Sequence, residues 1–293
     1  MKRSWRRILV GSTVALTLAV AAGCATLAHK ERELVFRVEP GEARWYSGLP
    51  DGVEELELAV PGQPLAKTPQ SIHAWWWKSP VADAPTVLYL HGSRWNLTGQ
   101  MFRIAGLREL GFSVLAIDYR GFGRSVGDLP SETTVYEDAQ IAWQRLVQLE
   151  PEPSRRFIYG HSLGGAVAID LAEHLAEHPS DQDRAAGLIV ESTFTNLADV
   201  AAAVLDTSLP VRWLLSQKFD SIDKIDRVGI PVLVVHGTSD RYVPARFSQE
   251  LFDRAKAPKR LLMVDGGTHN NSMRIGEDDY RAALRELFAL APS

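Results

Sequence analysis

Hydrophobic residues gather in short runs that recur along the chain, and longer segments of mixed polar and apolar character separate them. Most of these runs are continuous in Val, Leu and Ile rather than alternating, as expected of strands buried on both faces of a parallel sheet. The pattern predicts eight strands, at Glu55–Val60, Ile72–Lys78, Thr86–Leu90, Ser113–Ile117, Arg156–Tyr159, Leu188–Glu191, Val232–His236 and Arg260–Val264.

The segments between the strands are mostly helical in character, which indicates βα units and an α/β fold. The clearest predicted helices are Glu132–Leu149, with Ser131 as a candidate cap, Leu163–Glu177 and Asp278–Leu290. A Pro/Gly-rich turn without a helix joins the first two strands, which favours an antiparallel edge. About 40 residues separate Glu191 from Val232, enough for one or two helices but not for a folded cap domain. We therefore expect one domain over residues 51–293, with helices on both faces of the sheet and a minimal cap.

The N-terminus has the three parts of a secretory signal, in order. The basic start Met1–Arg7 is followed by the apolar run Ile8–Ala22, and small residues then precede Cys24. The apolar run is shorter than the ~18–20 residues that a spanning helix needs, so an uncleaved transmembrane anchor is the weaker interpretation. Residues 1–23 are predicted to be a signal peptide, and residues 24–50, which are mixed and charged, a tether.

Cys24 is the one cysteine of the chain, so a disulfide within the chain is impossible. The segment from Ala21 to Cys24 resembles the bacterial lipobox, in which the thiol is acylated and becomes the new N-terminus, although Leu is more usual at position 21. The resemblance implies a membrane-anchored lipoprotein on the periplasmic side, and Ala25 in place of Asp favours the outer membrane. Ordinary cleavage near Ala22, which leaves a free thiol, is the alternative. Export through the general or the twin-arginine route stays open.

Composition narrows the function classes. The hydrophobic fraction of 45% and the charged fraction of 23% are those of an ordinary globular protein. Without the first 23 residues the chain has 28 basic and 36 acidic side chains, and such an excess of acid disfavours nucleic acid and other polyanions as partners. No cluster has metal-ligand spacing and no cofactor fingerprint is present, so we expect neither a metal nor a cofactor. Oligomeric state is not predicted.

The candidate nucleophile is Ser162, in the segment Gly160–Gly165 of sequence GHSLGG. This segment directly follows a predicted strand and precedes a predicted helix. A serine held on a sharp strand-to-helix turn is exposed next to a helix N-terminus, and the turn needs small residues two before and two after it. The alternative, a glycine-rich turn that binds phosphate, lacks the lysine or the GxGxxG pattern that would accompany it.

A base and an acid should follow Ser162 in the order Asp, His. His269 lies in the loop after the last strand, and Asp240 lies in the turn after the strand that ends at His236. Asp240 would fix the tautomer of His269 and stabilise its imidazolium. Glu191 is the rival acid.

The remaining histidines are expected to have other roles. His236 is predicted to be a packed core residue, and His91 and His161 are expected to point away from the site.

An oxyanion formed at the substrate needs preorganised N–H donors. The amide of Leu163, directly after the nucleophile, is one candidate. The second should come from the loop after Thr86–Leu90, where we choose the amide of Ser93 and hold that of Arg94 in reserve.

Further segments make a family resemblance specific. His91-Gly92, the segment 118–125 (DYRGFGRS), the turn around Ser162, the segment 191–194 (ESTF), the turn 236–240 and the segment 267–270 (GTHN) occur in one order. Together they resemble the α/β-hydrolase superfamily over roughly residues 50–290. The nearest likeness is to the membrane-anchored branch related to fungal bud-emergence suppressors and animal protein depalmitoylases. The resemblance implies a triad at Ser162, Asp240 and His269, while Ser93-Arg94 and His161 depart from the residues common in that branch.

The predicted activity is cleavage of an ester or thioester through an acyl-Ser162 intermediate, with a small or acylated substrate. A peptidase of the same fold and a non-catalytic anchored scaffold are the alternatives, and fold alone does not choose between substrates.

Two apolar segments need a separate interpretation. Trp75–Trp77 is expected to pack in the domain rather than face a membrane, and Pro210–Leu215 is a candidate acyl-binding or interface surface, with core burial as the alternative.

Overall fold

The computed structural model of the protein describes residues 23, 25–62, 69–206 and 211–290. Residues 1–22 of the predicted signal peptide, Cys24 and Pro210 lie outside the described residues. The described strands are β1 (Val53–Ala59), β2 (Ser71–Trp77), β3 (Thr86–Leu90), β4 (Ser113–Ile117), β5 (Arg156–His161), β6 (Gly187–Glu191), β7 (Val232–Gly237) and β8 (Lys259–Val264). They form one eight-stranded sheet in the order β1-β2-β4-β3-β5-β6-β7-β8. The predicted number of strands is confirmed, and each strand lies within one or two residues of its predicted bounds.

The sheet is parallel from β4 to β8, and β1 and β2 form an antiparallel edge as predicted. All parallel strands therefore end at one edge of the sheet, called here the carboxyl edge. Crossover connections of this kind place helices on both faces.

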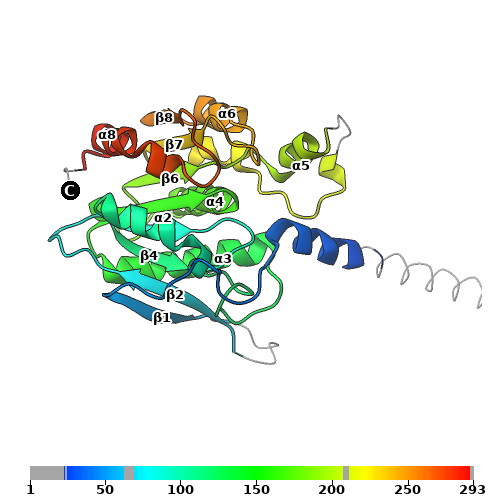
Figure 1. Cartoon of the computed structure of the whole chain (residues 1–293), viewed down its shortest axis with the longest axis horizontal. Helices are drawn as coiled ribbons and strands as arrows, with labels where there is room; N and C mark the ends of the chain where they lie inside the picture. Colours follow the sequence, from blue (N-terminus) through cyan, green and yellow to red (C-terminus); the bar gives the residue numbers. More distant parts are fainter. Residues whose placement is uncertain (1–22, 24, 63–68, 207–210, 291–293) are drawn as a thin grey trace, which may run out of the picture.

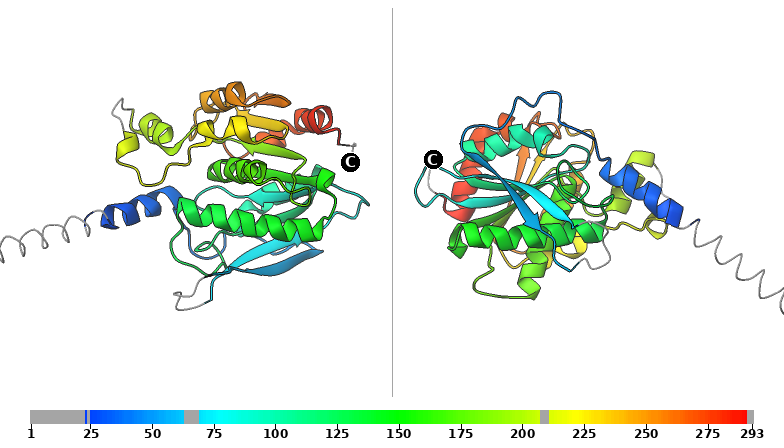
Figure 2. Two further views of the ribbon diagram at one scale, coloured as in Figure 1. Left: turned by 180° about the vertical axis from the view of Figure 1, so that it is seen from behind. Right: turned by 90° about the horizontal axis from the view of Figure 1, so that it is seen from below.

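The helices cover both faces of the sheet (Figures 1 and 2). They are a helix over residues 25–36, α2 (Leu97–Glu109), α3 (Glu132–Leu149), α4 (Leu163–Glu177), α5 (Leu197–Leu205), α6 (Arg246–Arg254), α7 (Ser272–Ile275) and α8 (Glu277–Phe288). Helices α2, α7 and α8 share one apolar core with the sheet, and α3, α4 and α6 share the other. The layered arrangement confirms the α/β architecture predicted from the sequence.

The connection between β6 and β7 is the minimal cap that the sequence indicates. Its described residues form α5 and the short 3-10 helices η2 (Val211–Trp213), η3 (Ser221–Asp223) and η4 (Ile225–Arg227).

The tryptophan run of β2 belongs to the interior, as expected. Trp75 and Trp76 are buried, and Trp77 packs against the core.

Residues 25–50 are not the tether that their mixed composition suggested. Residues 25–36 form a helix that ends at Phe36, which is fully buried against Phe122 and Phe219. The following loop is held to α2, since Ala43 N donates to Thr98 Oγ1 at 2.9 Å. The segment is therefore an integral part of the folded domain.

Candidate active site

Ser162 stands alone between β5, which ends at His161, and α4, which begins at Leu163. Its backbone has φ 55° and ψ −122°, outside the regions that a non-glycine residue prefers. Strand β6 and the loop after it hold this conformation, because Ser162 N donates to Glu191 O at 2.9 Å and Thr193 Oγ1 donates to Ser162 O at 2.8 Å. The strained turn leaves Ser162 partly exposed at the carboxyl edge, as a serine nucleophile requires.

The two glycines that flank Ser162 are required by close backbone packing. A Cβ atom at Gly160 would lie 2.1 Å from Gly164 O, and one at Gly164 would lie 2.1 Å from Leu90 O. Neither position has room for a side chain. The structural need predicted for small residues two before and two after the serine is therefore present in the molecule.

Asp240 and His269 meet across two loops, one after β7 and one after β8. Asp240 Oδ2 accepts a hydrogen bond from His269 Nδ1 at 2.7 Å. The other carboxylate oxygen accepts from the amides of Tyr242 and Val243, at 2.8 and 3.0 Å. Since Nδ1 is the donor to Asp240, the tautomer with a free Nε2 is selected, which is the form that can accept a proton from a serine.

The carboxylate of Asp240 is buried and yet charged. Its burial raises its pKa, but the hydrogen bonds from His236 and His269 outweigh burial, and the pKa lies well below its ordinary value. His236 Nε2 lies 3.2 Å from Asp240 Oδ2 and 3.0 Å from Val243 O, while its Nδ1 lies 2.6 Å from Ser248 Oγ. His236 is buried, as predicted, but it is also a direct neighbour of the candidate acid.

Glu191, the rival acid, makes a different set of contacts. It is fully buried, it accepts hydrogen bonds from the hydroxyls of Tyr159 and Tyr280, and its Oε1 lies 3.4 Å from Arg103 Nη2. The carboxylate that touches the imidazole of His269 is that of Asp240. This geometry favours Asp240 over Glu191 as the acid.

His161 does not point away from the site, contrary to expectation. Its Nε2 donates to His269 O at 2.8 Å, and the two rings have centroids 4.8 Å apart. Burial, the charge of Arg103 and the proximity of His269 hold the pKa of His161 well below its ordinary value, so the ring is neutral near pH 7. Arg103 Nη2, from α2, lies 3.4 Å from the same carbonyl. These contacts place the loop of His269 beside the turn of Ser162.

The candidate oxyanion donors lie at two converging turns. Leu163 opens α4, and the first N–H groups of a helix have no acceptor within the helix. The loop after β3 comes close to the nucleophile, since a Cβ at Gly92 would lie 3.1 Å from Ser162 Cβ. Two backbone N–H groups on these turns can face the same point next to Ser162.

The reserve donor, the amide of Arg94, is already in use. Arg94 has φ 87°, its N–H donates to Phe36 O at 2.7 Å, and its carbonyl accepts from Glu39 N at 3.0 Å. Ser93 is partly exposed beside it. The choice of Ser93 over Arg94 is therefore favoured, and residues 36–39 hold the loop in place.

The Ser162 hydroxyl and the His269 imidazole make no hydrogen bond to each other in this structure, and such contacts are often loose in the absence of substrate.

Among the described residues, no group of three or more His, Cys, Asp and Glu could hold a metal ion. Likewise, in the part of the chain that the structure covers, no helix has both the length and the apolar character to cross a membrane.

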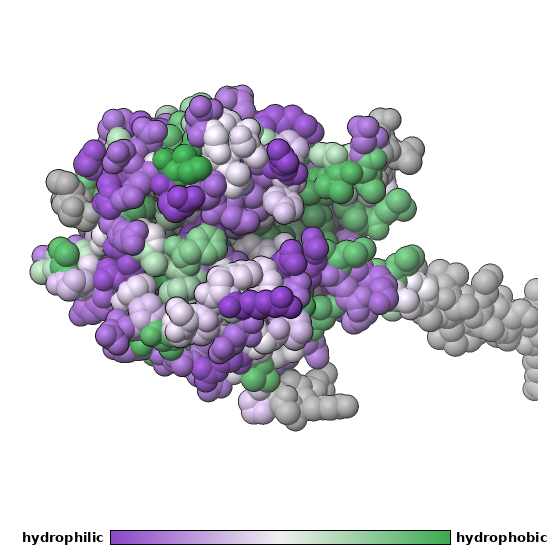
Figure 3. Space-filling model, in the orientation of Figure 1, coloured by the Kyte–Doolittle hydropathy of each residue, from purple (hydrophilic) through white to green (hydrophobic). Residues whose placement is uncertain are grey.

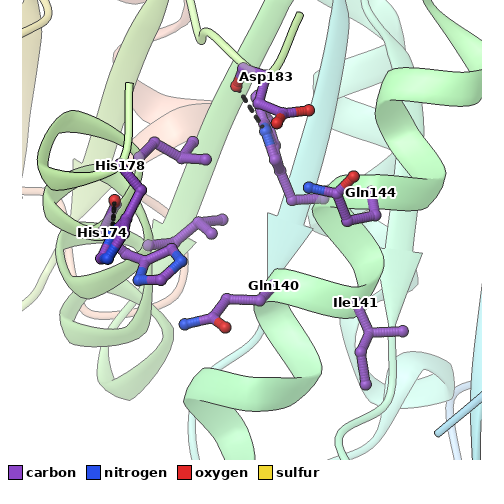
Figure 4. Close-up of a pocket in the computed structure, with 9 residues that line it drawn as sticks. Gln140, Ile141, Gln144, His174, His178 and Asp183 are labelled. Carbon is purple, nitrogen blue, oxygen red and sulfur yellow. Dashed lines mark hydrogen bonds between the residues drawn. The ribbon is translucent and has the colours of Figure 1, made fainter. Parts of the chain in front are cut away.

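A pocket of about 240 Å³ lies between α3 and α4, away from these residues. Its lining includes Gln140, Gln144, His174, His178 and Asp183 (Figure 4). His174 is twelve residues along α4 from Ser162, which corresponds to roughly 18 Å of helix. This pocket is not part of the candidate active site.

Comparison with known proteins agrees with the fold. The model of a family described as serine aminopeptidase, S33, matches residues 84–224. An uncharacterised protein of Mycobacterium tuberculosis is 34% identical over 272 residues, covering 92% of this chain and 91% of that protein. YfhR of Escherichia coli is 30% identical over 236 residues, covering 78% of this chain and 80% of that protein.

Two further comparisons involve proteins whose names state an activity. The lysophosphatidylserine lipase ABHD12 of Danio rerio is 33% identical over 204 residues, which cover 64% of this chain and 51% of the lipase. The structure of a Pyrococcus furiosus esterase covers 86% of this chain and 99% of its own with a TM-score of 0.62 at 19% identity, a likeness that concerns the fold alone. Taken with the sheet order and the turn of Ser162, these matches show that the chain belongs to the α/β-hydrolase superfamily and is a hydrolase of that fold.

Proposed function

We propose that the protein hydrolyses carboxylic ester or thioester bonds through an acyl intermediate on Ser162. The observation that carries the proposal is the 2.7 Å bond between His269 Nδ1 and Asp240 Oδ2, on a loop that His161 ties to the turn of Ser162. This bond leaves His269 Nε2 free to act as the base. A scaffold would have no need of a strained serine beside such a pair.

In the proposed reaction, Ser162 Oγ attacks the substrate carbonyl carbon while His269 Nε2 takes the hydroxyl proton. The amides of Leu163 and Ser93 stabilise the oxyanion of the tetrahedral intermediate. His269 then gives the proton to the departing alcohol or thiol, and the acyl group stays on Ser162. A water molecule, deprotonated by His269, attacks the acyl carbon. The bond between that carbon and Ser162 Oγ then breaks, Oγ takes the proton back from His269, and the carboxylic acid is released.

Ester and thioester substrates are favoured over peptides by the surroundings of the site. An aminopeptidase must bind the ammonium group of its substrate, for which carboxylates near the nucleophile are suited. The carboxylates of Asp240 and Glu191 are both engaged, since Asp240 binds two histidines and two amides, and Glu191 is buried with two tyrosines and Arg103. The lipase among the relatives gives further support for an acyl substrate.

A serine aminopeptidase is the second candidate, because the matching family model has that description. One experiment separates the two. The purified full chain is treated with a fluorophosphonate probe and then assayed with p-nitrophenyl esters, acyl thioesters and aminoacyl p-nitroanilides.

We expect labelling of Ser162 and turnover of esters or thioesters, and a Ser162→Ala control that loses labelling and about 10⁶-fold in kcat. Turnover confined to the anilides would instead identify a peptidase. A folded wild-type chain that is inert to the probe and to every substrate would favour the scaffold.

We also propose that the mature chain is a lipoprotein, acylated on Cys24 and held on the periplasmic side of a bacterial membrane. The basic start, the apolar run Ile8–Ala22 and the small residues before the single cysteine support this proposal. With this lipid anchor, the chain is best placed in the membrane-anchored, depalmitoylase-like branch of the family.

A further inference from the structure

Six large apolar side chains are exposed on neighbouring elements at one side of the molecule. They are Leu27 (72% exposed) and Leu34 (76%) on the helix 25–36, Val204 (70%) and Leu205 (65%) at the end of α5, and Trp213 (88%) and Leu214 (84%) at η2. We call this set the N-terminal apolar surface. Figure 3 shows hydrophobic residues gathered over α5, η2 and the N-terminal helix. Soluble proteins rarely expose such a group without a partner for it.

The elements that carry this surface are joined to one another. Leu27, Glu31 and Leu34 lie on one side of the helix, because residues spaced three, four and seven apart share a face. From that side, Glu31 accepts hydrogen bonds from Ser216 N and Gln217 N at 2.8 to 2.9 Å and from Ser216 Oγ at 2.6 Å. Helix α5 packs against η2. The six side chains therefore belong to one continuous region.

This region lies where the chain enters the domain (Figures 1 and 2). In the sequence, the apolar run Ile8–Ala22 and Cys24 come directly before the helix. Leu34 is ten positions after Cys24 in the sequence, and ten residues of helix are only about 15 Å long. A group that holds Cys24 at a bilayer would bring the surface to that bilayer as well.

The folded segment 25–46 removes the freedom that a tether would have. Glu31 fixes the helix to the segment after η2, Arg32 Nη1 donates to Leu129 O at 3.1 Å, and Phe36 is buried. The domain cannot swing away from its N-terminus without breaking these contacts. Its orientation at a membrane is set by the fold.

We propose that the N-terminal apolar surface docks in the headgroup region of a lipid bilayer. The inference rests on the proposed attachment through Cys24. Trp213, Leu214 and Leu34 would enter the boundary between headgroups and acyl chains, where tryptophan is favoured and exposed aliphatic side chains lose contact with water. The cations of Lys30 and Arg212 are close to these residues in the sequence and would remain at headgroup level.

The same docking would orient the candidate active site. Helix α5 follows the carboxyl end of β6, and Phe36 binds the loop that follows the carboxyl end of β3. The apolar surface and Ser162 therefore share the carboxyl edge of the sheet. Docked in this way, the enzyme would act on acyl groups carried by molecules at the surface of the bilayer.

The test uses the full chain, purified with its natural modification and reconstituted in phosphatidylethanolamine/phosphatidylglycerol vesicles. An environment-sensitive fluorophore is attached at Leu214→Cys, and the lipids carry a quencher in their acyl chains. The matched control is Val81→Cys. Val81 is also an exposed apolar residue, but it lies between β2 and β3 at the opposite edge of the sheet.

We expect blue-shifted emission and several-fold stronger quenching at position 214 than at position 81. Adding Glu31→Ala should reduce quenching at 214 while the protein stays bound, because the contact between the helix and the segment after η2 is lost. Equal, water-like emission at both positions in vesicle-bound protein would overturn the proposal. Shielding at 214 that is not quenched by the lipid and grows with the protein-to-lipid ratio would show that a second copy of the chain covers the surface, and it would also overturn it.

Each underlying proposal has a separate readout. Vesicle flotation reports whether the chain is anchored, and an intact mass reports whether Cys24 is acylated or has taken up the fluorophore. Hydrolysis of a water-soluble p-nitrophenyl ester by the unlabelled protein reports the proposed chemistry. A failure of docking can therefore be told apart from a failure of hydrolysis or of anchoring.

Discussion

His161 donates a hydrogen bond from its Nε2 to the main-chain carbonyl of His269, at 2.8 Å. The residue directly before the candidate nucleophile thus holds the backbone of the candidate base. Arg103 lies 3.4 Å from the same carbonyl and 3.4 Å from Glu191, so the base is also connected to a buried charged cluster on α2 and β6. The position of the candidate triad depends on residues outside it.

The neutral state of His161 gives a prediction for stability against pH. Its pKa in the folded protein lies well below 6.5, because of burial, Arg103 and His269. Below pH 6.5, His161 is therefore protonated in the unfolded chain but stays neutral in the folded chain. The contribution of neutral His161 to the free energy of unfolding is fully present above about pH 6.5. It is lost as the pH falls toward the folded pKa, by up to ~1.4 kcal/mol per pH unit.

Chemical denaturation between pH 7.5 and 5 measures this effect. The free energy of unfolding of wild type should decrease toward acid more steeply than that of His161→Gln. Since His91 is also buried with a lowered pKa and is retained in both proteins, the difference between them isolates His161. Parallel curves for the two proteins would contradict the prediction.

The choice of acid is tested by two matched amide substitutions. Asp240→Asn should keep the fold but favour the wrong tautomer of His269, with a loss on the order of 10⁴ in kcat. Glu191→Gln should act mainly on stability, by about 3 kcal/mol, because Arg103 would lose its charged partner in the interior. Steady-state kinetics and thermal melting of both variants give the comparison, and a larger loss of kcat in folded Glu191→Gln would move the acid to Glu191.

The sheet and the sharp turn of Ser162 could be predicted because their signals are local. Continuous apolar runs mark strands buried on both faces, and the glycines around Ser162 follow from contacts of 2.1 Å that leave no space for a side chain. The candidates Asp240 and His269 follow from their places after the strands β7 and β8, and the structure brings them into contact. The order of strands then brings the ends of these strands together.

The supporting contacts of the site are not local, and the sequence did not reveal them. Helix α2 is not among the clearest predicted helices, since its buried positions include the polar residues Gln100 and Arg103, which interrupt an apolar stripe. Its Arg103 and the neighbouring His161 meet His269 from positions 166 and 108 residues away in the chain. Residues 25–50 were interpreted as a tether because of their charge. The single buried Phe36 carries no recognisable pattern.

Phe36 leads to a third prediction. It packs against Phe122 and Phe219, and its carbonyl accepts the amide hydrogen bond of Arg94 next to the proposed oxyanion donor Ser93. Phe36→Ala should cost about 3–5 kcal/mol of stability, as for other buried aromatic residues. Thermal melting should detect this loss, whereas Arg37→Ala at the exposed neighbouring position should melt like wild type. Unchanged melting of both variants would restore the tether interpretation.

The proposed lipidation predicts a defined mass. In a bacterial host, the mature chain should begin at residue 24 and carry added acyl mass, and it should fractionate with membranes. Cys24→Ser should abolish the modification, because the thiol is the site of acylation. Intact mass spectrometry of membrane and soluble fractions decides the question, and a soluble, unmodified wild-type product would refute the proposal.

The last prediction concerns the acyl group. The described part of the cap is α5 and three short 3-10 helices, which is too little chain for a large lid that opens. We expect p-nitrophenyl esters with short to medium acyl chains to be hydrolysed best, with kcat/KM decreasing for long chains. Docking through the N-terminal apolar surface would be permanent in the anchored protein, so aggregation of the substrate should not switch the enzyme on.

A substrate concentration series for each chain length, carried through the critical micelle concentration, measures both effects. The rate should follow a hyperbola without a break at that concentration. Ser162→Ala in the same series corrects for spontaneous hydrolysis, and it should show no dependence on chain length beyond the uncatalysed rate. A rate that rises sharply once micelles form would mean that part of the cap moves at a lipid surface, and a site without a lid that opens would then be the wrong description.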